Sequence, residues 1–169
     1  MKAIVFSDTH GSLESLDKAI FHYKPDAIFG LGDYDAEEME LENRNVVGVR
    51  GNSYFDPPYD DDLFIDRDGF RILFTHGHKH GVRYGLDSLY AYCLNNHVDI
   101  CFFGHTHIAT IEKKGKIYFI NPGSLGIPES PSYPTLILMN LENKKAEIQI
   151  IDPTDFGSYR EVTITKDGE

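Results

Sequence analysis

The sequence predicts an α/β protein in which two mixed β-sheets pack face to face and helices flank them. In the first two thirds of the chain, apolar runs with the composition of strands alternate with segments of helical periodicity. This order is typical of parallel strands with helical connections. After about residue 108, strand-like runs follow one another with turn residues between them, as in antiparallel sheets. The two patterns together favour two packed sheets.

Short apolar runs mark the strands of the alternating part. They cover residues 3–6, 27–31, 46–49, 72–74 and 100–103. A first helix is predicted after Ser12, a residue type that favours a helix N-terminus, and it ends before Pro25. A second helix is predicted over 86–94. The acidic segment 35–42 is interpreted as a short solvated helix or a turn without chemistry of its own.

The remaining predicted strands are joined by turns. Residues 63–65 and 70–74 are predicted to form a hairpin, because Asp68-Gly69 between apolar runs favours a tight turn. The other strands are predicted over 108–111, 116–120, 135–141 and 146–151. Residues 153–169 are interpreted as a weakly structured tail or an interface strand.

Composition limits the classes of protein that the chain can represent. Its 169 residues fit one domain, which we expect to cover residues 1–169. A formal net charge of −11 gives no long-range attraction to extended nucleic acid or an anionic membrane. No apolar stretch approaches the ~18 to 20 residues of a membrane span, and residues 1–6 are too short for a signal sequence. We therefore expect a cytoplasmic protein without a membrane partner.

Cysteine is not expected to take part in the chemistry. Cys93 and Cys101 are the two cysteines, and they fall in a predicted helix and a predicted buried strand. Two thiols in a chain of this size do not suggest a disulfide framework. We interpret both as reduced residues of the core.

Residue types that bind metals follow the predicted strands of the alternating part. Because loops after parallel strands converge on one crevice, these side chains are expected to meet in space. Carboxylate, amide and imidazole groups in this mixture suit Mn, Fe, Zn, Co or Ni. Each motif alone is an ordinary turn sequence, whereas the ordered set predicts a two-metal hydrolase. The predicted ligands are Asp8, His10, Asp33, Asn52, His76, His105 and His107.

These motifs resemble those of the calcineurin-like metallophosphoesterases. The resemblance rests on Asp8-Thr9-His10, Gly32-Asp33, Gly51-Asn52, His76-Gly77-His78 and Gly104-His105-Thr106-His107. Within that superfamily, the short chain and Asn121-Pro122-Gly123-Ser124 are similar to the small prokaryotic phosphodiesterase group, whose fold also serves a eukaryotic retromer subunit. The resemblance covers residues 4–126 and implies a four-layer αββα sandwich.

The resemblance implies two divalent cations, with Mn²⁺ the first expectation, and assigns the ligands to them. One ion would be held by Asp8, His10, Asp33 and His107, and the other by Asp33, Asn52, His76 and His105. Asp33 would bridge them, because two cations about 3.5 to 4 Å apart need anionic charge between them. The pair would lower the pKa of a bridging water, and the hydroxide would attack a small phosphate diester. Substrate contacts are expected from Asn52, His78, Asn121 and Ser124.

Two positions differ from the resembled family. Ser53 follows Gly51-Asn52 where many members have a histidine that protonates the leaving group, and a serine hydroxyl is too weak an acid for that step. His78 and His80 are alternative proton donors, and each is equally compatible with a supporting or surface position. Glu129 stands where the small prokaryotic group often has an arginine, so this loop is not expected to bind phosphate.

Other functions compete with the phosphodiesterase. A binding scaffold that has lost turnover, as in the retromer subunit, should lack metal ligands, and here every predicted position has a usable donor. A metallo-β-lactamase-type site would need His-x-His-x-Asp-His, and the segment 75–80 does not continue with an acid. The aromatic residues over 54–59 are interpreted as a lid over the site or an interface of a homo-oligomer. The physiological ester and the oligomeric state are left open.

Overall fold

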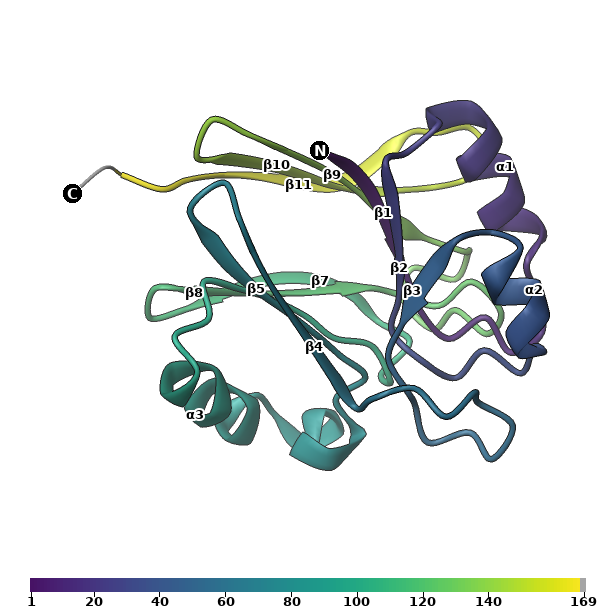
Figure 1. Cartoon of the computed structure of the whole chain (residues 1–169), viewed down its shortest axis with the longest axis horizontal. Coiled ribbons are helices and arrows are strands. Elements are labelled where there is room, and N and C mark those ends of the chain that lie inside the picture. The colour runs from purple at the N-terminus through teal and green to yellow at the C-terminus, as the bar shows by residue number, and fades with distance from the viewer. Residues whose placement is uncertain (168–169) are drawn as a thin grey trace.

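A computed structural model describes residues 1–167 of the chain. Two β-sheets face each other, and helices lie against their outer faces (Figure 1). The arrangement is the predicted α/β fold with two mixed sheets. No helix among the described residues is long and apolar enough to cross a membrane.

The first sheet has six strands in the order β11-β10-β9-β1-β2-β3. Strands β1, β2 and β3 are parallel, and β9, β10 and β11 are antiparallel to their neighbours. The bounds are β1 Lys2–Phe6, β2 Ala27–Gly30, β3 Val46–Gly48, β9 Leu136–Glu142, β10 Lys145–Ile151 and β11 Ser158–Thr165.

The second sheet has five strands in the order β4-β5-β6-β8-β7. Its three inner strands are parallel, and the edge strands β4 and β7 are antiparallel to them. The predicted hairpin is confirmed, with its turn at Asp68 and Gly69, which both have positive φ as a tight turn of this kind requires. The bounds are β4 Asp62–Arg67, β5 Phe70–Thr75, β6 Ile100–Phe102, β7 Ala109–Lys114 and β8 Ile117–Pro122.

Three apolar layers hold the sheets and helices together. Between the sheets, the rings of Phe29 on β2 and Phe74 on β5 stack with centroids 4.2 Å apart. Successive residues of β1 point to opposite faces, so Val5 packs between the sheets while Ile4 packs beneath the helices. This burial on both faces explains why the central strands read as continuous apolar runs.

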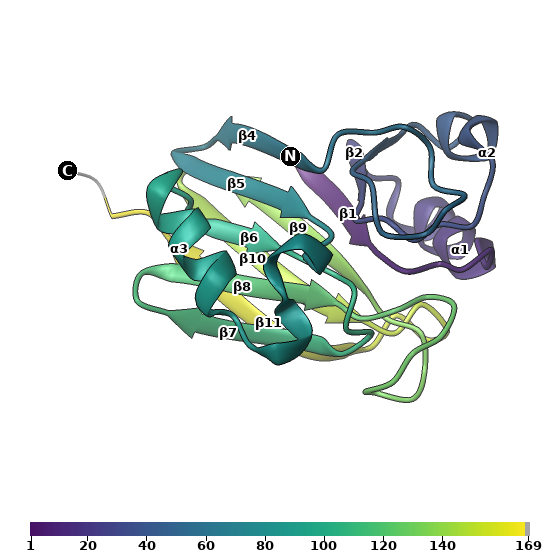
Figure 2. The ribbon, with the colours of Figure 1, turned by 90° about the horizontal axis from the view of Figure 1, so that it is seen from below.

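The helices cover opposite sides of the sandwich. Helices α1, Glu14–Tyr23, and α2, Glu38–Glu42, pack on the six-stranded sheet, and α3, Asp87–Asn95, packs on the five-stranded sheet. Two short 3-10 helices precede α3, η1 over His78–His80 and η2 over Val82–Tyr84. Figure 2 shows α3 across the five-stranded sheet with α1 and α2 on the far side of β1 and β2. The four-layer αββα order implied by the resemblance is confirmed.

The first helix differs from the prediction, and the chain end forms a strand. Of the two interpretations of residues 153–169, a weakly structured tail or an interface strand, the structure shows a strand over Ser158–Thr165, β11. Val162 and Ile164 alternate inward and pack on the core between the sheets. Residues 168 and 169 lie outside the described part. Helix α1 begins at Glu14 without a side-chain cap, so the predicted capping by Ser12 is wrong. The Ser12 backbone N–H instead donates to the Thr9 carbonyl in the preceding loop.

The two cysteines are buried and unpaired, as predicted. Cys93 lies in α3 and Cys101 in β6, beneath that helix. Burial raises the pKa of the Cys101 thiol well above its ordinary value, so this thiol is poorly reactive.

Candidate metal centre

The predicted metal ligands gather at the carboxyl ends of strands from both sheets. In the six-stranded sheet, Asp8 follows β1 and Asp33 follows β2, whereas His76 follows β5 and His105 follows β6 in the five-stranded sheet. The strands of each set are parallel, so the loops after them lie at one edge. Packing of the two sheets then brings both sets of loops together.

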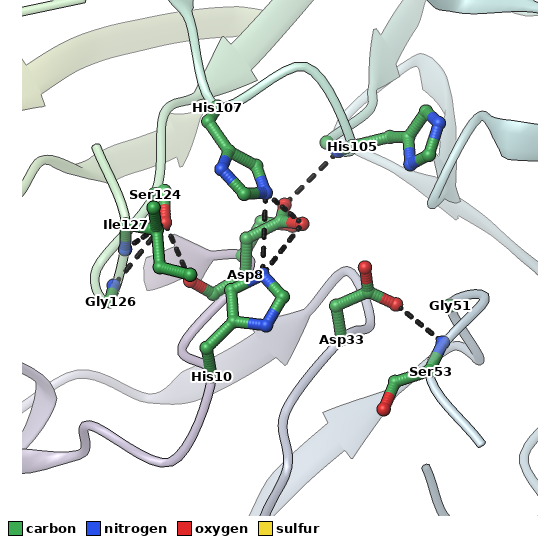
Figure 3. Close-up of polar contacts among 12 residues, drawn as sticks. Asp8, His10, Asp33, Gly51, Ser53, His105, His107, Ser124, Gly126 and Ile127 are labelled. Carbon is green, nitrogen blue, oxygen red and sulfur yellow. Dashed lines mark hydrogen bonds and ion pairs between the residues drawn. The ribbon is translucent and has the colours of Figure 1, made fainter. Parts of the chain in front are cut away.

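Asp8, His10 and His107 form the first donor group. Each residue offers one ligand atom, and these atoms all lie within 4.8 Å of one another. His107 Nε2 lies 3.1 Å from Asp8 Oδ1 and 3.3 Å from His10 Nε2 (Figure 3). The donor atoms therefore converge on one point from two loops, the one after β1 and the one after β6.

Asp33, His76 and His105 form the second donor group, and their ligand atoms also lie within 4.8 Å of one another. His76 Nε2 lies 3.4 Å from Asp33 Oδ2 and 3.2 Å from His105 Nδ1. Asn52 joins this group because its Oδ1 lies 2.9 Å from His76 Nε2. The His105 backbone N–H donates to Asp8 Oδ2 at 3.0 Å, so the two groups are adjacent.

Two imidazoles have a ring nitrogen that faces away from the donor groups and contacts an oxygen atom, as metal-binding histidines commonly do. His76 Nδ1 donates to the Leu31 carbonyl at 2.6 Å, so Nε2 is the nitrogen that faces the donor group. His10 Nδ1 lies 2.9 Å from Asp35 Oδ2. Such contacts orient a ring and select its ligand nitrogen. The two groups therefore fit divalent cations that accept nitrogen and oxygen ligands.

The electrostatic environment of the centre favours an anionic Asp33. Burial opposes the charge on Asp33, but the hydrogen bond and the positive charge from His76 lower the pKa of Asp33 below its ordinary value. Burial lowers the pKa of His105 to about 4, and the charges of His76 and Arg83 act in the same direction. Asp33 is thus ready to bind a cation, and His105 is neutral at physiological pH.

Backbone conformation at the centre is unusual. Asp8, His10, Asp33, His105 and His107 all have positive φ, between 43° and 70°. Residues other than glycine rarely adopt this region, and they do so mainly where the surrounding structure imposes it, often at functional sites. The loops therefore accept local strain to turn these side chains toward each other.

The glycines of two motifs allow close approach of neighbouring loops. A Cβ at Gly51 would fall on the Asp33 side chain and backbone, and a Cβ at Gly104 would fall on Ser7 Oγ and near Asp8 Oδ2. Any larger residue would displace the carboxylates of the centre.

Asp56 is a supporting residue that sequence reasoning missed. Its buried carboxylate accepts the backbone N–H groups of Asp33 and Gly51 at 2.7 Å and that of Tyr34 at 2.8 Å. The loops after β2 and β3 are thereby joined through one side chain. Its position four residues after Asn52 carries no metal-binding pattern, so only the fold reveals its role.

Asp35 is a second supporting residue, and it lies in the acidic segment 35–42, for which the sequence predicts no chemistry. Its Oδ2 contacts His10 Nδ1, and its Oδ1 accepts the Ser53 hydroxyl at 2.5 Å. The Ser53 backbone N–H in turn donates to Asp33 Oδ1 at 2.9 Å (Figure 3). Ser53 therefore positions Asp33, whichever group protonates a leaving oxygen.

Asn121 and Ser124, expected to contact substrate, are fully buried and support other loops. The Asn121 amide donates to the Gly104 carbonyl and to Thr106 Oγ1 at 3.1 and 2.9 Å. Ser124 donates to the Asp8 carbonyl at 2.7 Å (Figure 3). Their hydrogen bonds are used within the protein, so the structure gives them a supporting position and not a surface one.

His78 lies beside the second donor group. Its ring centroid is 5.3 Å from that of His76, and its Nδ1 is buried without a hydrogen-bond partner. It lines a pocket of about 560 Å³ together with Asn52 and Ser53. Burial and the positive charge of His76 lower the pKa of His78 below its ordinary value. The other candidate donor, His80, packs against Tyr92 with ring centroids 4.7 Å apart.

An αββα sandwich with two adjacent donor groups at its strand ends defines a class of metal-dependent hydrolases. Residues 1–144 match the model of the calcineurin-like phosphoesterase superfamily domain. The chain therefore belongs to the calcineurin-like phosphoesterase superfamily.

Relatives of similar length are named as phosphoesterases. The chain is 31% identical over 155 residues to the probable metallophosphoesterase YsnB of Bacillus subtilis, covering 90% of this chain and 91% of that protein. It is 28% identical over 159 residues to the phosphodiesterase YfcE of Escherichia coli K12, covering 76% and 82% of the two chains.

Solved structures share the fold. A conserved uncharacterized protein from Streptococcus pneumoniae TIGR4 superposes with a TM-score of 0.84 at 24% identity, covering 98% of this chain and 97% of that one. Wild-type Vps29 of Entamoeba histolytica, in complex with zinc, superposes with a TM-score of 0.76 at 21% identity, covering 98% and 99%.

Proposed function

We propose that the protein is a phosphodiesterase that uses two divalent cations to hydrolyse small phosphate diesters. The observation that carries the proposal is the presence of two adjacent donor groups with oriented imidazoles. Asp8, His10 and His107 would hold one cation, Asn52, His76 and His105 the other, and Asp33 would bridge them. Mn²⁺ is the first expectation among the ions that this donor set accepts.

The cations, when bound, would activate water and neutralise the negative charge that develops on the phosphate. The chain's own residues perform the other tasks. Asp35 and Ser53 hold His10 and Asp33 in place, and Asp56 holds the loops that present Asp33 and Asn52. His78, which lines the adjoining pocket together with Asn52, is the side chain that we propose to donate a hydrogen bond or a proton to an ester oxygen.

A diester is favoured over a monoester by charge. The protein has a net charge of −11, and Glu129 stands where the family often has an arginine. A monoester dianion brings one more negative charge into this acidic setting than a diester does. The cytoplasmic location and the single domain over the whole chain remain predictions.

Asp33→Asn tests the proposal, with Asp68→Asn as the matched control. Asp68 lies in the turn before β5, at the other end of that strand from His76, and Asn-Gly suits the same turn. Wild-type protein and the control should contain about two metal ions per chain by mass spectrometry and should cleave bis-p-nitrophenyl phosphate. Asp33→Asn should lose metal and about 10³-fold or more in turnover.

Other outcomes of the same metal and turnover measurements would contradict the proposal. Full wild-type turnover with a single equivalent of metal, or an unaffected Asp33→Asn variant, contradicts a two-metal site. Wild-type protein that binds metal and cleaves neither mono- nor diesters is the outcome expected of a binding scaffold, the competing function.

A further inference from the structure

Arg83 contacts the outer face of a metal ligand. It lies on η2 between Gly81 and Gly85, and its side chain is exposed. Its Nε donates to His105 Nε2 at 3.0 Å, and one terminal nitrogen lies 3.4 Å from the His105 carbonyl oxygen. Because a guanidinium only donates hydrogen bonds and does not lose its charge, His105 Nε2 must accept and carries no proton.

The proton position of His105 follows from this contact. A neutral His105 that accepts at Nε2 has its proton on Nδ1, which lies 3.2 Å from His76 Nε2. His76 Nδ1 donates to the Leu31 carbonyl, so Nε2 is the nitrogen that this ring presents to the donor group. While His105 accepts from Arg83, it therefore carries its proton on the nitrogen that faces the donor group.

Metal binding and the contact to Arg83 exclude each other. His105 points Nδ1 into the second donor group, so a cation there must take the place of the Nδ1 proton. A neutral metal-bound imidazole carries its proton on the other nitrogen. The Nδ1 proton is then lost to solvent, and Nε2 takes one from solvent. Nε2–H and the Arg83 Nε–H would face each other as two donors, and the guanidinium must leave.

The released guanidinium has room and a reason to bind an anion. Arg83 lines a pocket of about 400 Å³ beside the centre, whose other walls include Phe103, Thr106 and Ile108. A guanidinium close to two divalent cations is repelled unless an anion lies between them. Planar guanidinium groups suit phosphate oxygens, which they bind through two parallel hydrogen bonds.

We propose that Arg83 is a phosphate-binding residue that metal loading releases from His105. The proposal rests on the two-metal phosphodiesterase proposed above. In this role, Arg83 on η2 supplies a positive charge for the phosphate. The loop that carries Glu129 lacks such a charge, because Glu129 stands where the resembled family often has an arginine. Glu112 and Glu129 line the same pocket and are the competing partners for a released Arg83.

The tautomers of His105 give a first test that does not depend on activity. In ¹⁵N-labelled protein, NMR of the imidazole nitrogens should show His105 with an unprotonated Nε2 when metal-free. After loading with diamagnetic Zn²⁺, Nε2 should be protonated and Nδ1 should be the metal-bound nitrogen. A proton already on Nε2 in the metal-free protein, or no exchange of the two nitrogens on loading, overturns the proposal.

Binding of inorganic phosphate to the Zn²⁺-loaded protein gives the second test. Arg83→Met removes the charge and keeps the apolar stem, Arg83→Lys keeps the charge, and Arg160→Met on β11 is a matched control at an exposed site. By calorimetry, Arg83→Met should bind phosphate about tenfold or more weakly, Arg83→Lys should be intermediate, and the control should equal wild type. Zn²⁺ affinity of Arg83→Met should be equal to or tighter than wild type.

The outcomes separate the two proposals. Unchanged phosphate affinity in Arg83→Met shows that the released side chain pairs elsewhere, for example with Glu129, and overturns the inference. Weaker Zn²⁺ binding in Arg83→Met also overturns it, because Arg83 then holds His105 in its ligand position. Wild-type protein that binds no metal contradicts the proposed function itself.

Discussion

Asp56 determines the geometry of the centre although it contributes no ligand atom. Three backbone N–H groups from two loops converge on its carboxylate, and burial raises its pKa against the opposing effect of these hydrogen bonds. In Asp56→Asn, the new NH₂ group faces backbone donors and leaves at least one of them unsatisfied. We expect a loss of about 1 to 3 kcal/mol in the free energy of unfolding and about tenfold weaker metal binding.

Urea denaturation and metal titration measure these two effects. Asp68→Asn, in the hairpin turn, serves again as the control and should leave both quantities close to wild type. An Asp56→Asn variant with wild-type stability and wild-type metal affinity would show that the two loops hold their positions without this carboxylate.

His78 can be tested at the same scale through the leaving group. If it protonates the leaving oxygen, His78→Ala should cost about 10²-fold or more for alkyl diesters, whose leaving groups need a proton. Nitrophenyl esters should lose little, because their leaving groups depart as anions. His80→Ala is the matched control, since that ring packs against Tyr92. Turnover measured across a series of leaving groups distinguishes the roles, and an equal loss for both ester types would assign His78 to the support of His76.

At the scale of elements, β11 shows how an edge strand contributes to the core. It pairs with β10 along seven register positions from Lys145↔Thr165 to Ile151↔Ser158, and Ile164 is buried against both sheets while Thr163 is exposed. Ile164→Ala should lower the free energy of unfolding by about 2 to 3 kcal/mol. Thr163→Ala should change it by about 0.5 kcal/mol or less. Urea denaturation followed by circular dichroism compares the two, and equal effects would mean that β11 does not pack as described.

At the scale of the whole molecule, the donor groups connect the two sheets. Asp8 and His10 come from the loop after β1, whereas His107 comes from the loop after β6 of the other sheet. A cation bound by such a group stabilises the folded state, by about 2.7 kcal/mol when its concentration is a hundredfold above the dissociation constant. Removal of metal by EDTA should therefore lower the melting temperature by about 5 to 10 °C, and Mn²⁺ should restore it.

Calorimetry of the metal-free and reloaded protein measures this shift. Asp33→Asn should respond much less than wild type, because it lacks the proposed bridging carboxylate. A melting temperature that is the same with EDTA and with Mn²⁺ would mean that the two donor groups do not hold a cation in the folded protein.

Much of the fold and of the donor set was predictable because both depend on local patterns. Apolar runs of strand composition identify β1, β2, β5 and β6, and the ligand types stand directly after them. Parallel strands bring those positions together whatever the details of packing. At β11 the sequence leaves a tail and a strand open, because a short period-two pattern among polar residues is weak until β10 is present to pair with it.

The sequence by itself determined which strands form and which donors follow them, since periodicity and residue type are carried by neighbouring residues. The tertiary structure alone decided which of these metal-binding side chains lie together in one donor group. His107 and Asp8 are 99 residues apart, and their contact depends on how one sheet packs on the other. Packing also determines the contacts of Asp56 with two loops, the buried positions of Asn121 and Ser124, and the hydrogen bond from Arg83 to His105. Side-chain contacts between distant segments depend on packing and backbone conformation, and no local pattern encodes them.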